Sequence, residues 1–312
     1  MKLSVALCTY NGEAYIEKQL HSILNQTIPV DEIVVCDDGS TDNTIDIIEA
    51  FKRGISIDIR IYRNEKNIGV CANFQKAVNL CNGDIIFLSD QDDIWHSCKT
   101  KIIVKWFEDN PNKKVVFTNA DIIDCSSREI SDSTLFDIVG FNKPIQDFFS
   151  IGTELAFVYL GWNYATGATM AIKGKYQFLQ YCSKGIYHDF IIFLMAAVHK
   201  KAGFISQPLI KYRLHDNQTE GLGRSSNSNR ADINNLINPE MNQRWHGYLP
   251  IPETNECTSY IHFQWWRSSI ISQKQGIISI LIRAKKYKSI YNKKWAKCMA
   301  YDIKRWMTTK SH

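Results

Sequence analysis

Short apolar runs alternate with segments of helical spacing over the first 90 residues, and this alternation constrains the fold more than any other feature. The apolar runs cover residues 3–9, 32–36, 55–64 and 84–88, and the helix-like segments cover 15–27, 40–51 and 69–80. Apolar runs of this length are typical of buried strands. Strands that alternate with helices predict right-handed βαβ units, and so an α/β fold with a mostly parallel sheet flanked by helices.

Polar residues follow three of the four expected strands directly. They are TYN at 9–11, DDGS at 37–40 and DQDD at 90–93. Ligands of such sheets bind at the carboxyl ends of the strands. We therefore expect the three polar segments to meet in one binding site.

The three carboxylates of DQDD repel one another, which indicates that a positive charge belongs between them. Neither GxGxxG nor GxxxxGK[ST] occurs, so no glycine-rich phosphate cradle is expected. Carboxylates suit Mg²⁺ or Mn²⁺, and these ions are typically held by one or two carboxylates together with substrate phosphates. The segment therefore predicts a cation that holds a diphosphate.

Several classes of protein are disfavoured by the sequence. The apolar start MKLSVALCTY is too short for a signal peptide, and no run approaches the length of a membrane-spanning helix. Nine cysteines without a CxxC pair indicate reduced thiols in a cytoplasmic protein and no zinc site. No nucleic-acid-binding motif is recognised.

Four ordered motifs resemble glycosyltransferase family 2, a family of inverting enzymes with the GT-A fold. They are TYNGEAYIEKQLHSILNQT, IVVCDDGSTDNT, RNEKNIGVCANFQKAV and FLSDQDDIW. The resemblance covers about the first 215 residues. The form SDQDDIW is most similar to bacterial rhamnosyltransferases that build surface polysaccharides.

The resemblance implies which residues bind the nucleotide of a sugar donor. Thr9, Tyr10 and Asn11 match the lining of the nucleoside pocket. Asp38 matches a carboxylate that accepts hydrogen bonds from a pyrimidine base, which favours a UDP- or dTDP-sugar. Asn67 falls where the family approaches the nucleoside.

The resemblance also implies a metal site for Mg²⁺ or Mn²⁺. Asp90 matches the acid near the ribose and the metal, and Asp92 matches the acid that binds the metal. His215 is expected at the metal and Arg213 at the diphosphate. Asp93 is expected to shape the loop.

The acceptor side is expected in the second half of the chain. NYATGATMAIK resembles the strand before the acceptor pocket, where Gly167 permits a close approach of the backbone. Asp189 matches the catalytic base of the family, which deprotonates the acceptor hydroxyl. Two alternatives stay open: Asp189 as the N-cap of the following helix, and His188 as a residue that orients the acceptor.

The chain is expected to contain three parts: a GT-A domain at 1–215, a polar linker at 216–257, and a basic helical extension at 258–312. From Arg267 onward it carries 12 Lys and Arg against one acid, whereas the rest has a net charge of −6. Such an extension suits an anionic membrane surface, or it packs on the domain with its lysines solvated.

These features together predict a metal-dependent inverting glycosyltransferase. It would move a sugar, with rhamnose as one candidate, from a nucleotide donor to a glycan or lipid-linked acceptor. The expected location is the cytoplasm, with peripheral attachment to the inner membrane face and no nucleic-acid partner. The alternative is a non-catalytic protein that keeps the fold and binds nucleotide sugars.

Overall fold

A computed structural model describes residues 1–130, 132–141, 143, 146, 164–182, 187–216 and 218. These residues belong to one compact unit, made of Met1–Glu154 and Asn163–Gly223. The expected extension at 258–312 and almost all of the expected linker lie outside the described residues. Within the described part, no helix is long and apolar enough to cross a membrane.

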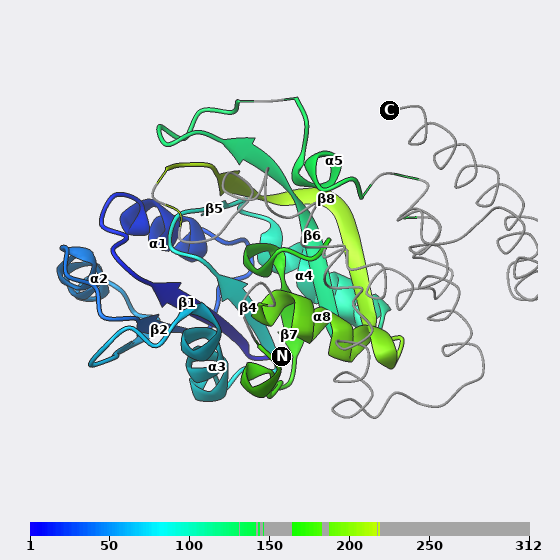
Figure 1. The fold of residues 1–312 in the computed structure, drawn as a ribbon, viewed down its shortest axis with the longest axis horizontal. Helices are drawn as coiled ribbons and strands as arrows, with labels where there is room; N and C mark the ends of the chain where they lie inside the picture. The colour runs from blue at the N-terminus through cyan, green and yellow to red at the C-terminus, as the bar shows by residue number, and fades with distance from the viewer. Residues whose placement is uncertain are drawn as a thin grey trace, which may run out of the picture. The chain divides into compact units, whose positions relative to one another are not determined.

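The first half of the unit contains the predicted alternation of strands and helices (Figure 1). Its elements are β1 (Leu3–Thr9), α1 (Ile16–Leu24), β2 (Glu32–Asp37), α2 (Thr44–Lys52), β3 (Asp58–Arg63), α3 (Val70–Leu80), β4 (Ile85–Ser89), β5 (Ile94–Trp95) and α4 (Lys99–Asp109). Strands β3, β2, β1 and β4 are neighbours and all run parallel. The predicted βαβ units are therefore confirmed.

The second half converts the sheet into a mixed one. Its elements are β6 (Val115–Ile123), α5 (Leu135–Ile138), η1 (Gly167–Thr169), β7 (Ala171–Lys173), η2 (Leu179–Tyr181), α8 (His188–Val198) and β8 (Ala202–Arg213). The eight strands have the order β3-β2-β1-β4-β7-β6-β8-β5. Strand β7 runs antiparallel to β4 and β6, and β5 runs antiparallel to β8. The second half therefore departs from an all-parallel arrangement.

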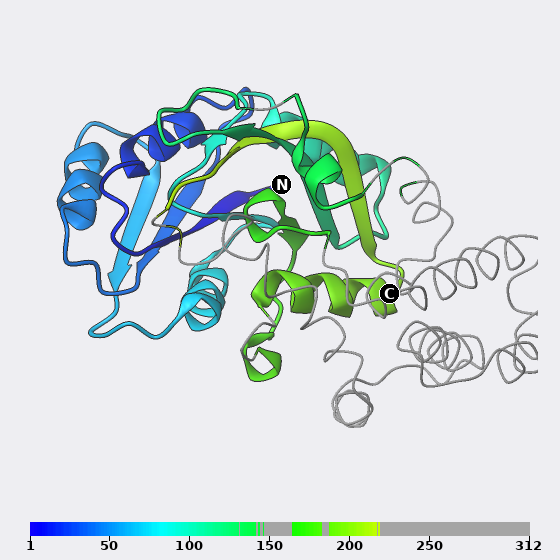
Figure 2. The same cartoon turned by 45° about the horizontal axis from the view of Figure 1, so that its top comes forward.

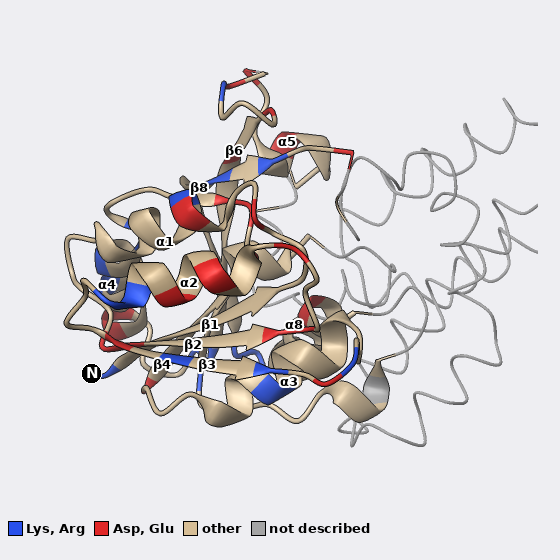
Figure 3. Ribbon diagram, turned by 90° about the vertical axis from the view of Figure 1, so that its left-hand side faces the viewer, with Lys and Arg blue, Asp and Glu red and all other residues tan. Residues whose placement is uncertain are grey.

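Side chains that alternate along the strands give the sheet two buried faces. Val5 and Leu7 of β1 share an apolar core with Ile16 and Leu20 of α1. On the other face, α3 and α8 lie on the same side of the sheet (Figure 2), and Phe74 of α3 stacks on a ring of α8. Charged residues belong mainly to helices and loops rather than to the strands (Figure 3). Both faces of the sheet are therefore covered, which leaves the strand ends for a site.

Glu32 stabilises the opposite, amino-terminal edge of the sheet. Its side chain is 1% exposed, and its carboxylate accepts hydrogen bonds from the Ser4 hydroxyl, the Asn82 N–H and the Arg60 guanidinium. Burial by itself would raise the pKa of Glu32, but these three partners outweigh it and lower the pKa to about 2. The charged form therefore stabilises the folded state.

Glu32→Gln should lower the free energy of unfolding at pH 7 by about 3 kcal/mol, since the pKa is lowered by about two and a half units and each unit corresponds to about 1.4 kcal/mol. The stabilisation is present above the unfolded pKa near 4.5 and is lost as the pH falls towards 2. Thermal unfolding at pH 7, 4 and 3 should show the stabilities of wild type and Glu32→Gln converging as the pH falls. The exposed Glu49→Gln is the matched control. An equal difference in stability between wild type and Glu32→Gln at pH 7 and pH 3 would contradict the role of the charge.

Candidate active site

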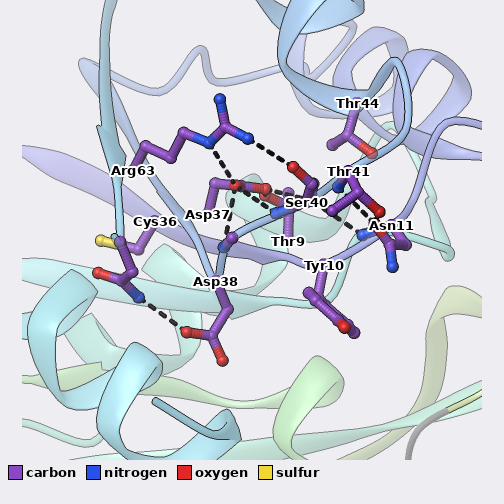
Figure 4. Close-up of polar contacts among 12 residues, drawn as sticks. Thr9, Tyr10, Asn11, Cys36, Asp37, Asp38, Ser40, Thr41, Thr44 and Arg63 are labelled. Atoms are coloured by element: carbon purple, nitrogen blue, oxygen red, sulfur yellow. Dashed lines mark hydrogen bonds and ion pairs between the residues drawn. The ribbon is translucent and has the colours of Figure 1, made fainter. Parts of the chain in front are cut away.

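The loops that follow β1 and β2 are joined by hydrogen bonds at the carboxyl end of the sheet (Figure 4). The register pairs Thr9 with Asp37, so both strands end level with each other. The Thr9 hydroxyl donates to Asp37 Oδ2 at 2.9 Å, and the Asn11 N–H donates to Ser40 Oγ at 2.9 Å. Asn11 has a positive φ of 49°, which turns the chain back towards α1. Gln91 of the third segment contacts the Tyr10 backbone, so all three polar segments predicted to meet do so.

Asp37 and Asp38 have different surroundings, although they are adjacent and both buried. Asp37 Oδ1 accepts the N–H groups of Gly39 at 3.2 Å and Ser40 at 2.9 Å, and the Arg63 guanidinium lies 3.8 Å away. In Figure 4 the Asp38 carboxylate points away from this group. Asp37 therefore fixes the loop that presents Asp38.

Asp38 organises the chain that leads into α3. Its Oδ1 accepts Asn64 Nδ2 at 2.9 Å and the Ile68 N–H at 2.8 Å, and its Oδ2 accepts the Gly69 N–H at 2.9 Å. Asn67 is exposed, and its Oδ1 accepts the same Gly69 N–H at 3.1 Å. The structure therefore brings together Asp38, expected at the pyrimidine base, and Asn67, expected near the nucleoside. It also gives Asp38 a structural task that the sequence did not indicate.

The three acids after β4 contact different partners. Asp92 Oδ2 lies 2.9 Å from His215 Nε2, across 123 residues of sequence. Asp93 is buried, and its Oδ1 accepts the Arg213 N–H at 3.0 Å. Asp90 is half-buried. The segment thus divides into Asp93, which holds β8, and two acids available to a ligand.

Arg213 and His215 lie beside Tyr15 at the end of β8. Arg213 is completely buried, with Nε donating to the Asp92 carbonyl at 2.6 Å and Nη1 to the Asp124 carbonyl at 2.8 Å. Its guanidinium carbon lies 4.6 Å from the centre of the Tyr15 ring. The centre of the His215 ring lies 4.7 Å from the centre of the same Tyr15 ring. Arg213 thus fixes the backbone of the loop that carries Asp92. Its expected role at the diphosphate stays a prediction.

The charge of this loop is balanced only in part by the chain itself. Burial and the Asp92 carboxylate raise the pKa of Asp90 to about 7. The buried Lys99 donates Nζ to the Ala168 carbonyl at 3.1 Å, and burial lowers its pKa to about 7 although Asp93 and Asp90 oppose this. The loop therefore favours an added cation. No pattern in the sequence marked Lys99, because a lysine this far buried is unusual.

The expected acceptor side lies against this loop. A Cβ on Gly167 would lie 2.7 Å from His188 Nε2 and 3.6 Å from Asp189 Cβ, so glycine lets η1 approach the start of α8 closely. His188 is buried and stacks on Phe74 with ring centres 4.1 Å apart. The charge of Asp189 is among the smaller causes that raise the pKa of Asp90.

Asp189 lies in the first turn of α8 and is not its N-cap. Tyr187 occupies the cap position, with φ −99° and ψ 172°. Asp189 Oδ1 accepts the adjacent Phe190 N–H at 2.7 Å, and the side chain is half-exposed. An acid in the first turn interacts well with the helix dipole, but the capping alternative does not describe its position.

A divalent cation would fit the donor atoms of Asp92 and His215. Carboxylate oxygen and imidazole nitrogen both ligate Mn²⁺. His215 Nδ1 is buried without a hydrogen-bond partner among the described residues, and the ring packs on Tyr15 with Nε2 towards Asp92. The described residues contain no ready group of three His, Cys, Asp or Glu ligands. The pair thus fits an ion completed by substrate phosphates.

Comparison with known proteins identifies the family of the chain. The model of glycosyl transferase family 2 matches residues 4–168, which is more than half of the chain. The chain therefore belongs to glycosyltransferase family 2. The dTDP-rhamnosyl transferase RfbG of Shigella flexneri is 30% identical over 227 residues, which span 69% of this chain and 73% of that protein.

Two solved structures share the fold. S. aureus TarS 1-349 in complex with UDP-GlcNAc has a TM-score of 0.54 and 19% identity, over 93% of this chain and 81% of that one. The mannosyltransferase PcManGT from Pyrobaculum calidifontis, in complex with GDP-Man and Mn²⁺, has a TM-score of 0.51 and 17% identity, over 97% of this chain and 85% of that one. The GT-A architecture expected from the motifs is thus confirmed.

Proposed function

We propose that the protein is a metal-dependent inverting glycosyltransferase that uses a pyrimidine nucleotide sugar in bacterial surface-polysaccharide synthesis. The observation that carries the proposal is the pairing of Asp92 Oδ2 with His215 Nε2 at 2.9 Å, beside the Tyr10 loop and Asp90. A dTDP-rhamnosyl transferase among the relatives and UDP-GlcNAc in a structural neighbour favour dTDP or UDP as the nucleotide.

The proposed reaction is a single displacement in which the acceptor oxygen attacks the anomeric carbon. Asp189 takes the proton of the acceptor hydroxyl, and the nucleoside diphosphate leaves from the opposite face, so the configuration inverts. Asp92 and His215 would hold a divalent cation. When bound, the cation neutralises the charge that develops on the leaving diphosphate. Asp38 and the Tyr10–Asn11 loop position the nucleoside.

The deciding experiment is a panel of nucleotide sugars, including dTDP-rhamnose and UDP-GlcNAc, titrated into purified full-length protein with Mn²⁺ or with EDTA. We expect one pyrimidine donor to bind and to be slowly hydrolysed with Mn²⁺ only. Tight binding of a donor without hydrolysis or transfer would instead support the non-catalytic binding protein. No binding of any donor would refute both.

We further propose that the basic extension from about Thr258 brings the enzyme to a lipid-linked acceptor at the cytoplasmic membrane face. The support is the sequence: 12 basic residues and one acid from Arg267 onward, interleaved with tryptophans such as Trp295 and Trp306. Each basic residue near an anionic surface contributes about 1 kcal/mol, which salt screens.

Full-length protein should therefore sediment with vesicles of anionic lipid and much less with neutral vesicles. Added salt should weaken the binding without abolishing it, because the apolar contribution of the tryptophans is not screened. Co-sedimentation between about 50 mM and 500 mM salt measures this. Protein that ignores anionic vesicles at the lowest salt would rule out the membrane role.

A further inference from the structure

Gln91, the residue between the two acids of the DQD segment, makes a paired contact with the backbone of Tyr10. Its Oε1 accepts the Tyr10 N–H at 2.8 Å, and its Nε2 donates to the Tyr10 carbonyl at 2.9 Å. One side-chain amide thus satisfies both backbone groups of a single residue, as a neighbouring strand would. Only a side chain that both donates and accepts can do this.

Gly12 supplies the room for this contact. A Cβ at Gly12 would lie 2.2 Å from Gln91 Oε1 and 2.4 Å from its Cδ, and all three of the nearest atoms belong to Gln91. Gly12 is not among the glycines with a positive φ, so space rather than backbone conformation requires glycine here. The two residues therefore form one fitted unit, defined here as the Gln91–Gly12 clamp.

The clamp connects the candidate nucleoside loop to the candidate metal loop. On its far side, the same loop is tied to the segment after β2: Asn11 Oδ1 accepts the Thr41 N–H at 2.8 Å, and the Asn11 N–H donates to Ser40 Oγ. Tyr10 itself is 39% exposed. Its backbone is thus fixed from both sides while its ring is free to meet a ligand.

We propose that Gln91 is a positioning residue that couples the binding of a nucleoside diphosphate to the binding of a divalent cation. The inference rests on the proposed function. Acids on either side of Gln91 would adjust when a cation binds, and the clamp would transmit that adjustment to the backbone of Tyr10. Coupling between two sites is reciprocal, so each ligand should raise the affinity for the other by the same factor.

The test titrates UDP and dTDP into full-length protein with EDTA and with Mn²⁺, for wild type, Gln91→Glu and Gln91→Ala. Gln91→Glu keeps the shape but turns a carboxylate oxygen towards the Tyr10 carbonyl. For Gln91→Glu, which loses the bond donated to the Tyr10 carbonyl, we expect about fivefold weaker nucleotide binding in EDTA, since one hydrogen bond contributes about 1 kcal/mol. The gain in affinity that Mn²⁺ confers should shrink in both variants.

A second measurement uses Gly12→Ala in two backgrounds. Alone, Gly12→Ala should weaken nucleotide binding about as much as Gln91→Ala, because the new methyl group displaces the amide. In the Gln91→Ala background it should add little further loss, since the space is then free. Such non-additivity is the signature of residues that act as one unit.

Two results would overturn the inference. If wild type binds UDP or dTDP and both Gln91 variants keep the same Mn²⁺-dependent gain, the proposed function stands and the coupling role fails. Additive losses for Gly12→Ala and Gln91→Ala would likewise refute the clamp. If wild type binds no nucleotide under any condition, the proposed function and the inference fail together. Unchanged melting temperatures show that the variants are folded.

Discussion

Asp92→Asn is expected to abolish sugar transfer and to remove most of the Mn²⁺-dependent binding of the donor. The carboxylate is one of the two described groups that fit the cation, and its Oδ2 lies 2.9 Å from the other, His215 Nε2. Losing even an outer partner of a metal ligand typically costs 10–100-fold, so the loss of a ligand itself should exceed about 100-fold. Donor hydrolysis and isothermal titration with Mn²⁺ measure the two effects.

The matched control for Asp92 is Asp46→Asn, which removes an exposed carboxylate in the first turn of α2. It should leave hydrolysis and Mn²⁺ dependence unchanged. The metal role of Asp92 would be wrong if Asp92→Asn retained full activity, or if wild type were fully active in excess EDTA. His215→Ala should parallel Asp92→Asn, because the two side chains form one pair.

Asp189→Asn is expected to bind the donor normally and to transfer sugar about 10²–10⁴-fold more slowly, the usual loss of one positioned base. The side chain lies in the first turn of α8, next to Gly167. An amide of the same shape cannot accept the proton of the acceptor hydroxyl. Transfer rates with a fixed donor concentration, together with donor titration, separate chemistry from binding.

A purely structural role for Asp189 predicts a different result. An acid in the first turn stabilises its helix by about 0.3–1 kcal/mol, so Asp189→Asn would lower the melting temperature slightly and leave transfer intact. The exposed Asp109→Asn, at the end of α4, is the control for general charge effects. A folded Asp189→Asn protein that transfers at the wild-type rate would show that the base lies elsewhere.

The roles assigned by resemblance agree with the structure to different degrees. Asp92 and His215 were placed in one site from motifs 123 residues apart, and the structure pairs them. Arg213 was expected at the diphosphate, and its Nε and Nη1 donate to the backbone carbonyls of Asp92 and Asp124, so that role stays a prediction. Asp38 was expected at the pyrimidine base. Its carboxylate also accepts the N–H groups of the two residues that precede α3. A motif thus predicts the location of a residue better than it predicts the contacts of that residue.

The sequence by itself determined the parallel half of the sheet and the edge at which the site forms. Apolar runs and helical spacing are local, and the βαβ rule then forces TYN, DDGS and DQDD to one edge. Only the tertiary structure decided how the acids divide. Asp93 accepts the Arg213 N–H, Asp92 lies against His215, the other candidate metal ligand, and Gln91 is bonded to the Tyr10 backbone, through contacts that span 81 to 123 residues. The reason is physical: such contacts depend on the packing of β8 and the antiparallel strands, which no local pattern encodes.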